Sequence, residues 1–155
     1  MDVNVITKDF TKVSEVQIGQ ILNRFYKYYS SKDGEENKYI FDISNISWIS
    51  NESLLVLTGL FKYLIERDVE FKVLFLKDGS SADIDKSVAS QFISMWEMWK
   101  IYQIVPNMDY FRYFDIDGAV INNLKKRYDI HYTTTEIYGR YNVTRFISLD
   151  NIEYY

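Results

Sequence analysis

The sequence contains no cysteine, one histidine and one proline among its 155 residues. Without cysteine the chain forms no disulfide bond and offers neither a thiolate metal ligand nor a cysteine nucleophile. A single histidine disfavours a histidine-rich metal centre and a serine–histidine–aspartate triad. The six glycines stand too far apart for a glycine-rich phosphate-binding loop. These absences argue against the usual nucleotide-binding folds and against enzymes that need a metal or a nucleophile–base pair.

Charge and hydropathy narrow the choice further. The formal net charge is −4, whereas nucleic-acid binders usually carry a basic surface. No apolar run approaches the roughly 20 residues that a membrane-spanning helix needs. The first residues, Met1–Asn4, lack the basic and apolar regions of a secretion signal. We therefore expect a cytoplasmic protein with no nucleic-acid or membrane partner.

Aromatic side chains are abundant. They make up 17% of the chain, including 14 tyrosines, and hydrophobic residues as a whole make up 47%. These fractions are typical of a folded domain rather than of a disordered chain. A buried tyrosine needs a hydrogen-bond partner for its hydroxyl. We therefore expect part of the tyrosine excess to lie on a surface used for protein contact.

Hydrophobic periodicity predicts alternating strands and helices. A capping-box sequence at Ser14–Gln17 opens an amphipathic helix. A strand is expected before it at Val3–Ile6, and a second helix at Glu52–Glu66 is flanked by expected strands at Tyr39–Ile43 and Val69–Leu76. This strand–helix–strand order predicts parallel strands with a right-handed crossover. The nearly continuous apolar run at Tyr39–Ile43 also predicts a strand that is buried on both faces.

A third helix is expected at Ile84–Gln103, with Pro106 ending the pattern, and a short strand at Tyr110–Phe114. No internal repeat is evident in the sequence.

The last part of the chain differs in character. Two β-prone runs, Ile130–Tyr138 and Tyr141–Leu149, surround a glycine and predict a β-hairpin after a short helix. This segment is too short for an independent core. We therefore divide the chain into a domain of residues 1–116 and a C-terminal extension of residues 117–155 that packs on it or adjoins it.

Few side chains suggest chemistry. Asp78, Asp83 and Asp85 follow the Val69–Leu76 strand, and ligands bind at the carboxyl edge of parallel strands in α/β proteins. A small-ligand or nucleotide sensor is therefore one alternative, although loop aspartates also commonly form turns and helix caps. His131 has no neighbouring carboxylate or second histidine. We expect no metal site and no cofactor.

The segment Phe41–Leu54, FDISNISWISNESL, resembles the signature of STAS domains, the fold of bacterial anti-sigma-factor antagonists. The family pattern is a buried strand ending in Asp-Leu-Ser, two residues, an aromatic residue and Ile, then Asp-Ser-Ser-Gly-Leu opening a helix. The order of strands and helices over residues 3–116 also follows the family. The resemblance implies an α/β fold with a mixed sheet and helices packed mainly on one side, here with a C-terminal β-hairpin extension.

The sequence departs from this family where antagonist proteins are phosphorylated. The family's Asp-Ser-Ser-Gly is replaced by Ser50, Asn51, Glu52 and Ser53. The phosphorylated serine falls on Asn51 or Glu52, neither of which accepts a phosphate, so the switch is lost or has moved to Ser50 or Ser53. Glu52 instead carries a permanent negative charge, which is favourable at a helix N-terminus.

We therefore expect a non-catalytic regulatory or scaffolding module that binds a protein, and not an enzyme. By resemblance, the partner would be an ATPase of the histidine-kinase-like class or a larger assembly. The expected contact surface is the segment Ser47–Leu55, with Trp48 and Leu55 as apolar anchors. Trp96, at the edge of the third helix's apolar face, is a further candidate anchor because tryptophan is frequent in interface hot spots, although it also fits the core. A second alternative is an assembly subunit of a multi-protein defence or signalling complex.

Overall fold

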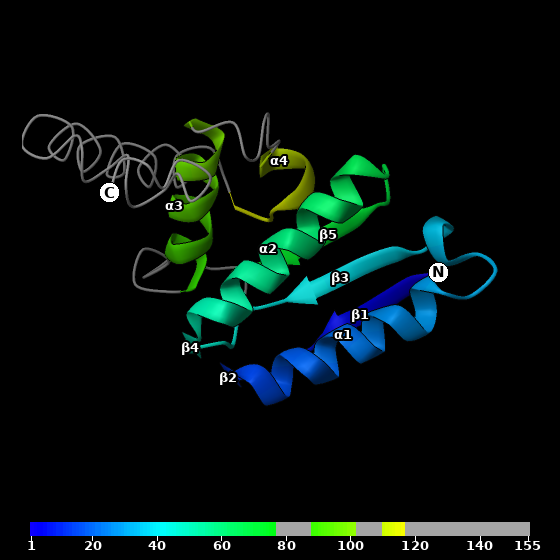
Figure 1. Ribbon diagram of the computed structural model, residues 1–155, viewed down its shortest axis with the longest axis horizontal. Helices are drawn as coiled ribbons and strands as arrows, with labels where there is room; N and C mark the ends of the chain where they lie inside the picture. Colours follow the sequence, from blue (N-terminus) through cyan, green and yellow to red (C-terminus); the bar gives the residue numbers. More distant parts are fainter. Residues whose placement is uncertain (77–87, 102–109, 117–155) are drawn as a thin grey trace, which may run out of the picture.

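The computed structural model describes residues 1–76, 88–101 and 110–116 (Figure 1). The expected ligand-sensor loop, His131, and the C-terminal helix and hairpin lie outside the described residues. The elements, in chain order, are β1 (Asp2–Ile6), β2 (Lys12–Val13), α1 (Glu15–Tyr29), a short 3₁₀ helix η1 (Gly34–Glu36), β3 (Lys38–Asp42), β4 (Trp48–Ile49), α2 (Asn51–Glu66), β5 (Phe71–Leu74), α3 (Val88–Ile101) and α4 (Tyr110–Tyr113).

The main sheet contains β1, β3 and β5 in that order, and both of its strand pairs are parallel. Tyr39 lies opposite Val3 on one side and opposite Phe71 on the other. A parallel bridge joins Val73 to Phe114, just after α4. The α/β class is therefore confirmed. The expectation of a mixed sheet is wrong for the described strands, and α4 is a helix where a short strand was expected, with only Phe114 reaching the sheet.

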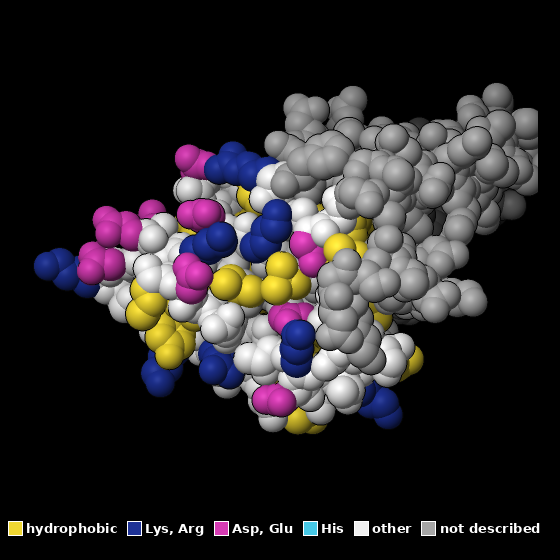
Figure 2. Space-filling view, turned by 180° about the vertical axis from the view of Figure 1, so that it is seen from behind, with side chains coloured by type: hydrophobic (Ala, Val, Ile, Leu, Met, Phe, Trp, Pro, Cys, Tyr) yellow, Lys and Arg dark blue, Asp and Glu magenta, His cyan; other side chains and the backbone are white. Residues whose placement is uncertain are grey.

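The helices lie mainly on one face of this sheet, as expected. α1 packs against α2, and α2 packs against α3. Side chains that point to this face, such as Val3, Tyr39 and Phe71, are buried, whereas the alternating side chains Ile40 and Lys72 are only half-buried. Seen from behind, the molecule shows apolar side chains interspersed with acidic and basic ones (Figure 2). The prediction that β3 is buried on both faces is therefore wrong.

The core between sheet and helices is built from aromatic rings in contact. The ring of Phe61 on α2 lies 5.0 Å from that of Phe41 on β3 and 5.5 Å from that of Phe71 on β5, between ring centroids. Phe71 in turn stacks on Tyr113 at 4.5 Å. Such pairs add to the stability that burial provides, and they account for much of the aromatic content of the sequence.

The structure contains an internal repeat that the sequence did not reveal. β2 pairs in parallel with β4, so that Lys12 lies opposite Trp48 and Val13 opposite Ile49, in each case the residue 36 positions later. At the same spacing, the turn that closes on Phe10 corresponds to the turn that closes on Ile46, each with a 3.1 Å backbone hydrogen bond. We call residues 2–29 unit 1 and residues 38–65 unit 2. Each unit is a strand, a tight turn, a two-residue strand and a helix.

Backbone hydrogen bonds join the two units side by side. The backbone N–H of Ser50 donates to the carbonyl oxygen of Val13 at 3.0 Å, and that of Ser47 donates to the carbonyl oxygen of Thr11 at 2.8 Å. The corresponding position in unit 1, Ser14, has a different partner. Its backbone N–H instead donates to Oε1 of Gln17 at 3.0 Å, which confirms the predicted capping-box contact.

Candidate functional site

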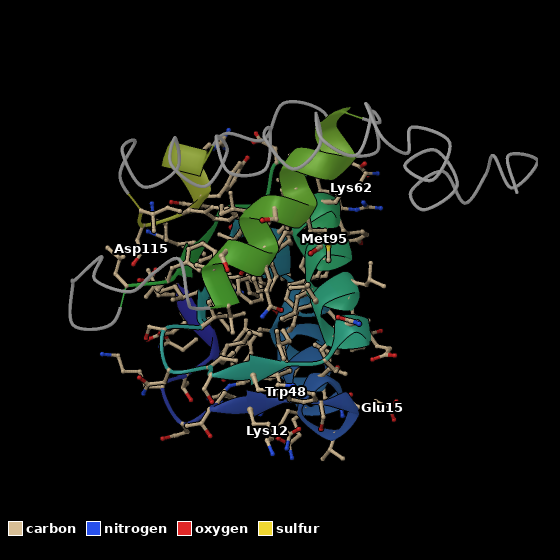
Figure 3. All side chains as sticks on the ribbon, turned by 90° about the vertical axis from the view of Figure 1, so that its left-hand side faces the viewer. Lys12, Glu15, Trp48, Lys62, Met95 and Asp115 are labelled. Carbon is tan, nitrogen blue, oxygen red and sulfur yellow. The ribbon has the colours of Figure 1, made fainter. Side chains whose placement is uncertain are left out.

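The candidate contact surface lies where unit 2 passes from β4 into α2. Trp48 stands opposite Lys12 across the β2–β4 pair, and the ammonium group of Lys12 lies 5.9 Å from the centre of the indole ring. Figure 3 shows Lys12, Trp48 and Glu15 at the same end of the molecule. Trp48 and Leu55 are each 49% exposed. Both expected apolar anchors therefore lie on the surface, as an anchor must.

Ser50 and Ser53 form the N-terminal cap of α2. The hydroxyl oxygen of Ser50 accepts a hydrogen bond from the backbone N–H of Ser53 at 3.2 Å, and its hydroxyl group donates to the hydroxyl oxygen of Ser53 at 2.7 Å. The side chain of Ser53 is fully buried, so the prediction of Ser53 as a phosphoacceptor is wrong for this fold. Ser50 is half-buried, and its hydroxyl contacts a second serine rather than a base that could activate it.

Asn51 and Glu52 are exposed in the first turn of α2. Glu52 forms no ion pair with any other described residue. Its carboxylate lies near the positive end of the helix dipole, where a negative charge is stabilising. We use the name β4–α2 surface for the exposed or half-buried residues of this region, namely Trp48, Ser50, Asn51, Glu52 and Leu55.

Trp96 does not belong to this surface. It lies on α3 and is 0% exposed, so its prediction as a partner-binding anchor is wrong. α3 packs on α2, with the hydroxyl group of Thr58 directed at the sulfur atom of Met95 at 3.6 Å. The indole N–H of Trp96 has no hydrogen-bond partner among the described residues. Periodicity placed Trp96 at the edge of the apolar face, but it could not show which neighbouring elements cover that edge.

The internal repeat provides a comparison for the exposed anchors. The residues of unit 1 that correspond to Trp48 and Leu55 are Lys12 and Gly19. The same backbone frame therefore folds with a charged residue at one position and no side chain at the other. Buried positions behave differently, because Ile21 corresponds to Leu57 and Phe25 to Phe61, all buried and apolar. Folding thus dictates the buried residues of the unit but does not require Trp48 or Leu55 to be apolar.

Two further exposed positions on α2 are apolar where the corresponding residues of unit 1 are polar. Val56 and Tyr63 are 38% and 36% exposed, and they correspond to Gln20 and Lys27 of unit 1. The opposite contrast, apolar in unit 1 and charged in unit 2, also occurs. Val16 and Tyr26 of α1 are exposed, and the corresponding residues of unit 2 are Glu52 and Lys62. Val16 and Tyr26 lie about 15 Å apart along the helix, so they form no continuous patch. Sequence reasoning missed Val56 and Tyr63, and the signal that finds them is the comparison between units.

The described residues contain little that would support catalysis. No group of three or more acidic or histidine side chains within them is placed to hold a metal ion. One cavity of about 320 Å³ borders Lys12 and is lined by Asp9, Phe10, Thr11, Lys12, Gln17 and Gln20. Its carboxylate and ammonium groups are exposed, and Gln17 is already bound to Ser14.

None of the described helices is long and apolar enough to cross a membrane. Comparison of the chain with protein-family models, with curated proteins and with solved structures finds no match.

Proposed function

We propose that this chain is a non-catalytic regulatory or scaffolding module that binds a protein partner through the β4–α2 surface. The observation that carries the proposal is the exposure of Trp48 and Leu55 at positions where unit 1 has Lys12 and Gly19. Hydration of exposed apolar side chains is entropically unfavourable, so burying Trp48 and Leu55 against a partner is favourable, and tryptophan is frequent in interface hot spots.

The resemblance of Phe41–Leu54 to STAS domains supports a regulatory role and a class of partner. It suggests an ATPase of the histidine-kinase-like class or a larger assembly that contains one. If a phosphorylation switch is retained, it uses Ser50, because Ser53 is buried and neither Asn51 nor Glu52 accepts a phosphate. Intact-mass analysis after incubation with such an ATPase would then show one added phosphate on the wild-type chain and none on Ser50→Ala.

Affinity purification of the tagged chain from its native cells tests the binding proposal. We expect a stoichiometric protein partner, and at least tenfold lower recovery with Trp48→Lys or Leu55→Gly. Each variant introduces the residue that the other unit already carries at that position, so both should fold normally. Trp48→Lys should change the free energy of unfolding by less than about 0.5 kcal/mol. Leu55→Gly should cost about 0.5–1 kcal/mol, because glycine is unfavourable inside a helix, which leaves the chain folded.

The reciprocal exchange supplies the control. Val16→Glu and Tyr26→Lys place unit 2 residues on α1, at positions that are more exposed than Trp48 and Leu55 and lie outside the β4–α2 surface. These variants should recover the partner at the wild-type level. Undiminished recovery with Trp48→Lys and Leu55→Gly would contradict the proposed surface, and thermal stabilisation by a nucleotide from a panel would favour the ligand-sensor alternative.

A further inference from the structure

The exposed side of α2 continues the β4–α2 surface along the helix. Leu55, Val56, Gly59 and Tyr63 lie on this side, and we call them the α2 strip. Leu55, Gly59 and Tyr63 are spaced four residues apart and therefore form one ridge of the helix surface. Figure 3 shows Trp48 towards the N-terminal end of α2 and Lys62 towards its C-terminal end.

Gly59 interrupts this ridge, and no contact among residues 1–76, 88–101 and 110–116 accounts for it. It lies in the middle of α2, where glycine is less favourable than alanine because its backbone loses more conformational freedom. Within the part of the chain that the structure describes, no atom lies within 4 Å of the position that a Cβ would occupy, so none of the described elements requires the missing side chain. Its backbone does not adopt the left-handed conformation that favours glycine. An unfavourable glycine at the centre of an exposed apolar strip is explained if another molecule approaches the backbone there.

We infer that the α2 strip seats an amphipathic helix of the protein partner, which crosses α2 at Gly59. The inference rests on the proposed function and names the element that the partner contributes. The gap between Leu55 and Tyr63 spans about 12 Å along the helix axis, enough for a side chain of a crossing helix to insert between them. Ridge-into-groove packing of this kind is the common mode of contact between helices.

The charges at the ends of the strip define the chemistry of that helix. Glu52 and Glu66 lie on the same line of α2, each seven residues from Gly59. Glu66 is bound to Lys62 at 2.6 Å, and the guanidinium group of Arg67 covers the ring of Tyr63 at 3.6 Å. Glu52 is left without an ion pair among the described residues. The partner helix therefore carries an apolar stripe with a lysine or arginine placed to face Glu52.

A second copy of this chain fits the strip less well. An antiparallel pair of α2 helices crossing at Gly59 would bring Glu52 of one copy towards Glu66 of the other, and like charges across an interface are unfavourable. The strip offers on the order of a few hundred Å², whereas a stable interface buries about 800 Å² on each partner. A helix that belongs to a larger partner, and that also covers Trp48, meets both requirements.

Selection from a display library of 16-residue helical peptides, randomised on one face, tests this inference. We expect the selected peptides to carry an apolar stripe with a basic residue at one end. Their affinity should fall at least tenfold for Gly59→Leu, which fills the gap, and should change less than twofold for Gly19→Leu. Gly19 is the matched control because it is also helical, and no atom of the described residues lies within 4 Å of the position its Cβ would occupy.

Thermal unfolding separates loss of binding from loss of folding. Gly59→Leu should unfold no earlier than the wild-type chain, and Gly59→Ala should unfold about 2–4 °C later. Peptides that bind Gly59→Leu as tightly as wild type, or an acidic rather than a basic residue in the selected stripe, would overturn the inference. A library that yields no peptide discriminating Gly59→Leu from Gly19→Leu would overturn it as well.

The native partner distinguishes this inference from the proposed function. If Trp48→Lys loses the partner but Gly59→Leu retains it, the partner uses the β4–α2 surface without a helix on the α2 strip, and only the inference fails. If both variants retain the partner, both the inference and the proposed function fail. Loss of the partner with Gly59→Leu and retention with Gly19→Leu supports both.

Discussion

Gly34 is the position where one added methyl group should be most damaging. It is buried in η1, the short 3₁₀ helix between α1 and β3. A Cβ atom there would lie 1.8 Å from the carbonyl oxygen of Tyr29, and the next two nearest atoms also belong to the Tyr29 backbone. A backbone at the end of a helix cannot rotate away as a flexible side chain can. Gly34→Ala must therefore push η1 away from α1.

The expected cost has two parts. Overpacking of this kind costs about 1–3 kcal/mol in the free energy of unfolding. The displaced turn also carries the carbonyl oxygen of Gly34, which accepts a 2.5 Å hydrogen bond from the hydroxyl group of Tyr39. The side chain of Tyr39 is 0% exposed, and leaving a buried hydroxyl without its partner costs about 1–3 kcal/mol. We expect Gly34→Ala to destabilise the protein by about 3 kcal/mol, a large share of the roughly 5–15 kcal/mol typical of a domain.

Urea unfolding followed by circular dichroism measures this difference. Gly59→Ala is the control, since it adds the same methyl group in open space and should gain about 0.5–1 kcal/mol. A double-mutant cycle with Tyr39→Phe tests the mechanism, because Tyr39→Phe should cost less once Gly34→Ala has displaced the acceptor. A Gly34→Ala protein within about 0.5 kcal/mol of wild type would refute the steric argument.

Two further predictions concern the tyrosine hydroxyl and the helix caps. Burial raises the pKa of Tyr39 above its ordinary value, so the folded state favours the neutral hydroxyl. The resulting contribution to the free energy of unfolding is fully present below about pH 10. It is lost as the pH rises towards the raised pKa. The urea midpoint of wild type should therefore fall more steeply above about pH 10 than that of Tyr39→Phe, and equal slopes would contradict this. Ser50→Ala should cost about 1 kcal/mol, because it removes the acceptor for the backbone N–H of Ser53. Ser14→Ala should cost less, because Gln17 still accepts from the backbone N–H of residue 14, and thermal unfolding of the two variants shows whether this order holds.

Local sequence patterns were sufficient for helices α1 and α2. The second helix was expected at Glu52–Glu66 and is observed as α2, Asn51–Glu66. The capping box at Ser14–Gln17 opens α1, as its spacing predicts. Both signals depend on side chains within a few residues of one another, so a single sequence contains them completely. The strand expected at Val69–Leu76 is shorter in the structure, Phe71–Leu74, because pairing with β3 rather than hydrophobicity sets its length.

Arrangements that depend on distant residues were not predictable in this way. The repeat is not evident in the sequence, because corresponding buried positions share a residue class rather than the same residue, as when Val13 corresponds to Ile49. β2 and β4 have only two residues each, too few to show a period. The burial of Trp96 depends on how α3 packs, which its own helical pattern does not contain. For the site, sequence reasoning identified Trp48 and Leu55 correctly as exposed, but it did not extend the surface to Val56, Gly59 and Tyr63.

The two units also explain why exposed apolar residues are informative in this protein when they usually are not. Isolated apolar side chains are common on protein surfaces and need no functional explanation. Here each exposed position of α2 has a counterpart that folds in the same frame, and Leu55 and Gly59 differ from theirs in opposite ways. Leu55 adds apolar surface where Gly19 has none, and Gly59 removes a side chain where Asn23 has one. Leucine is the better helix former, but folding does not require an exposed apolar side chain there, and Gly59 weakens the helix. A single cause that explains both is a partner that contacts Leu55 and comes close to the backbone at Gly59.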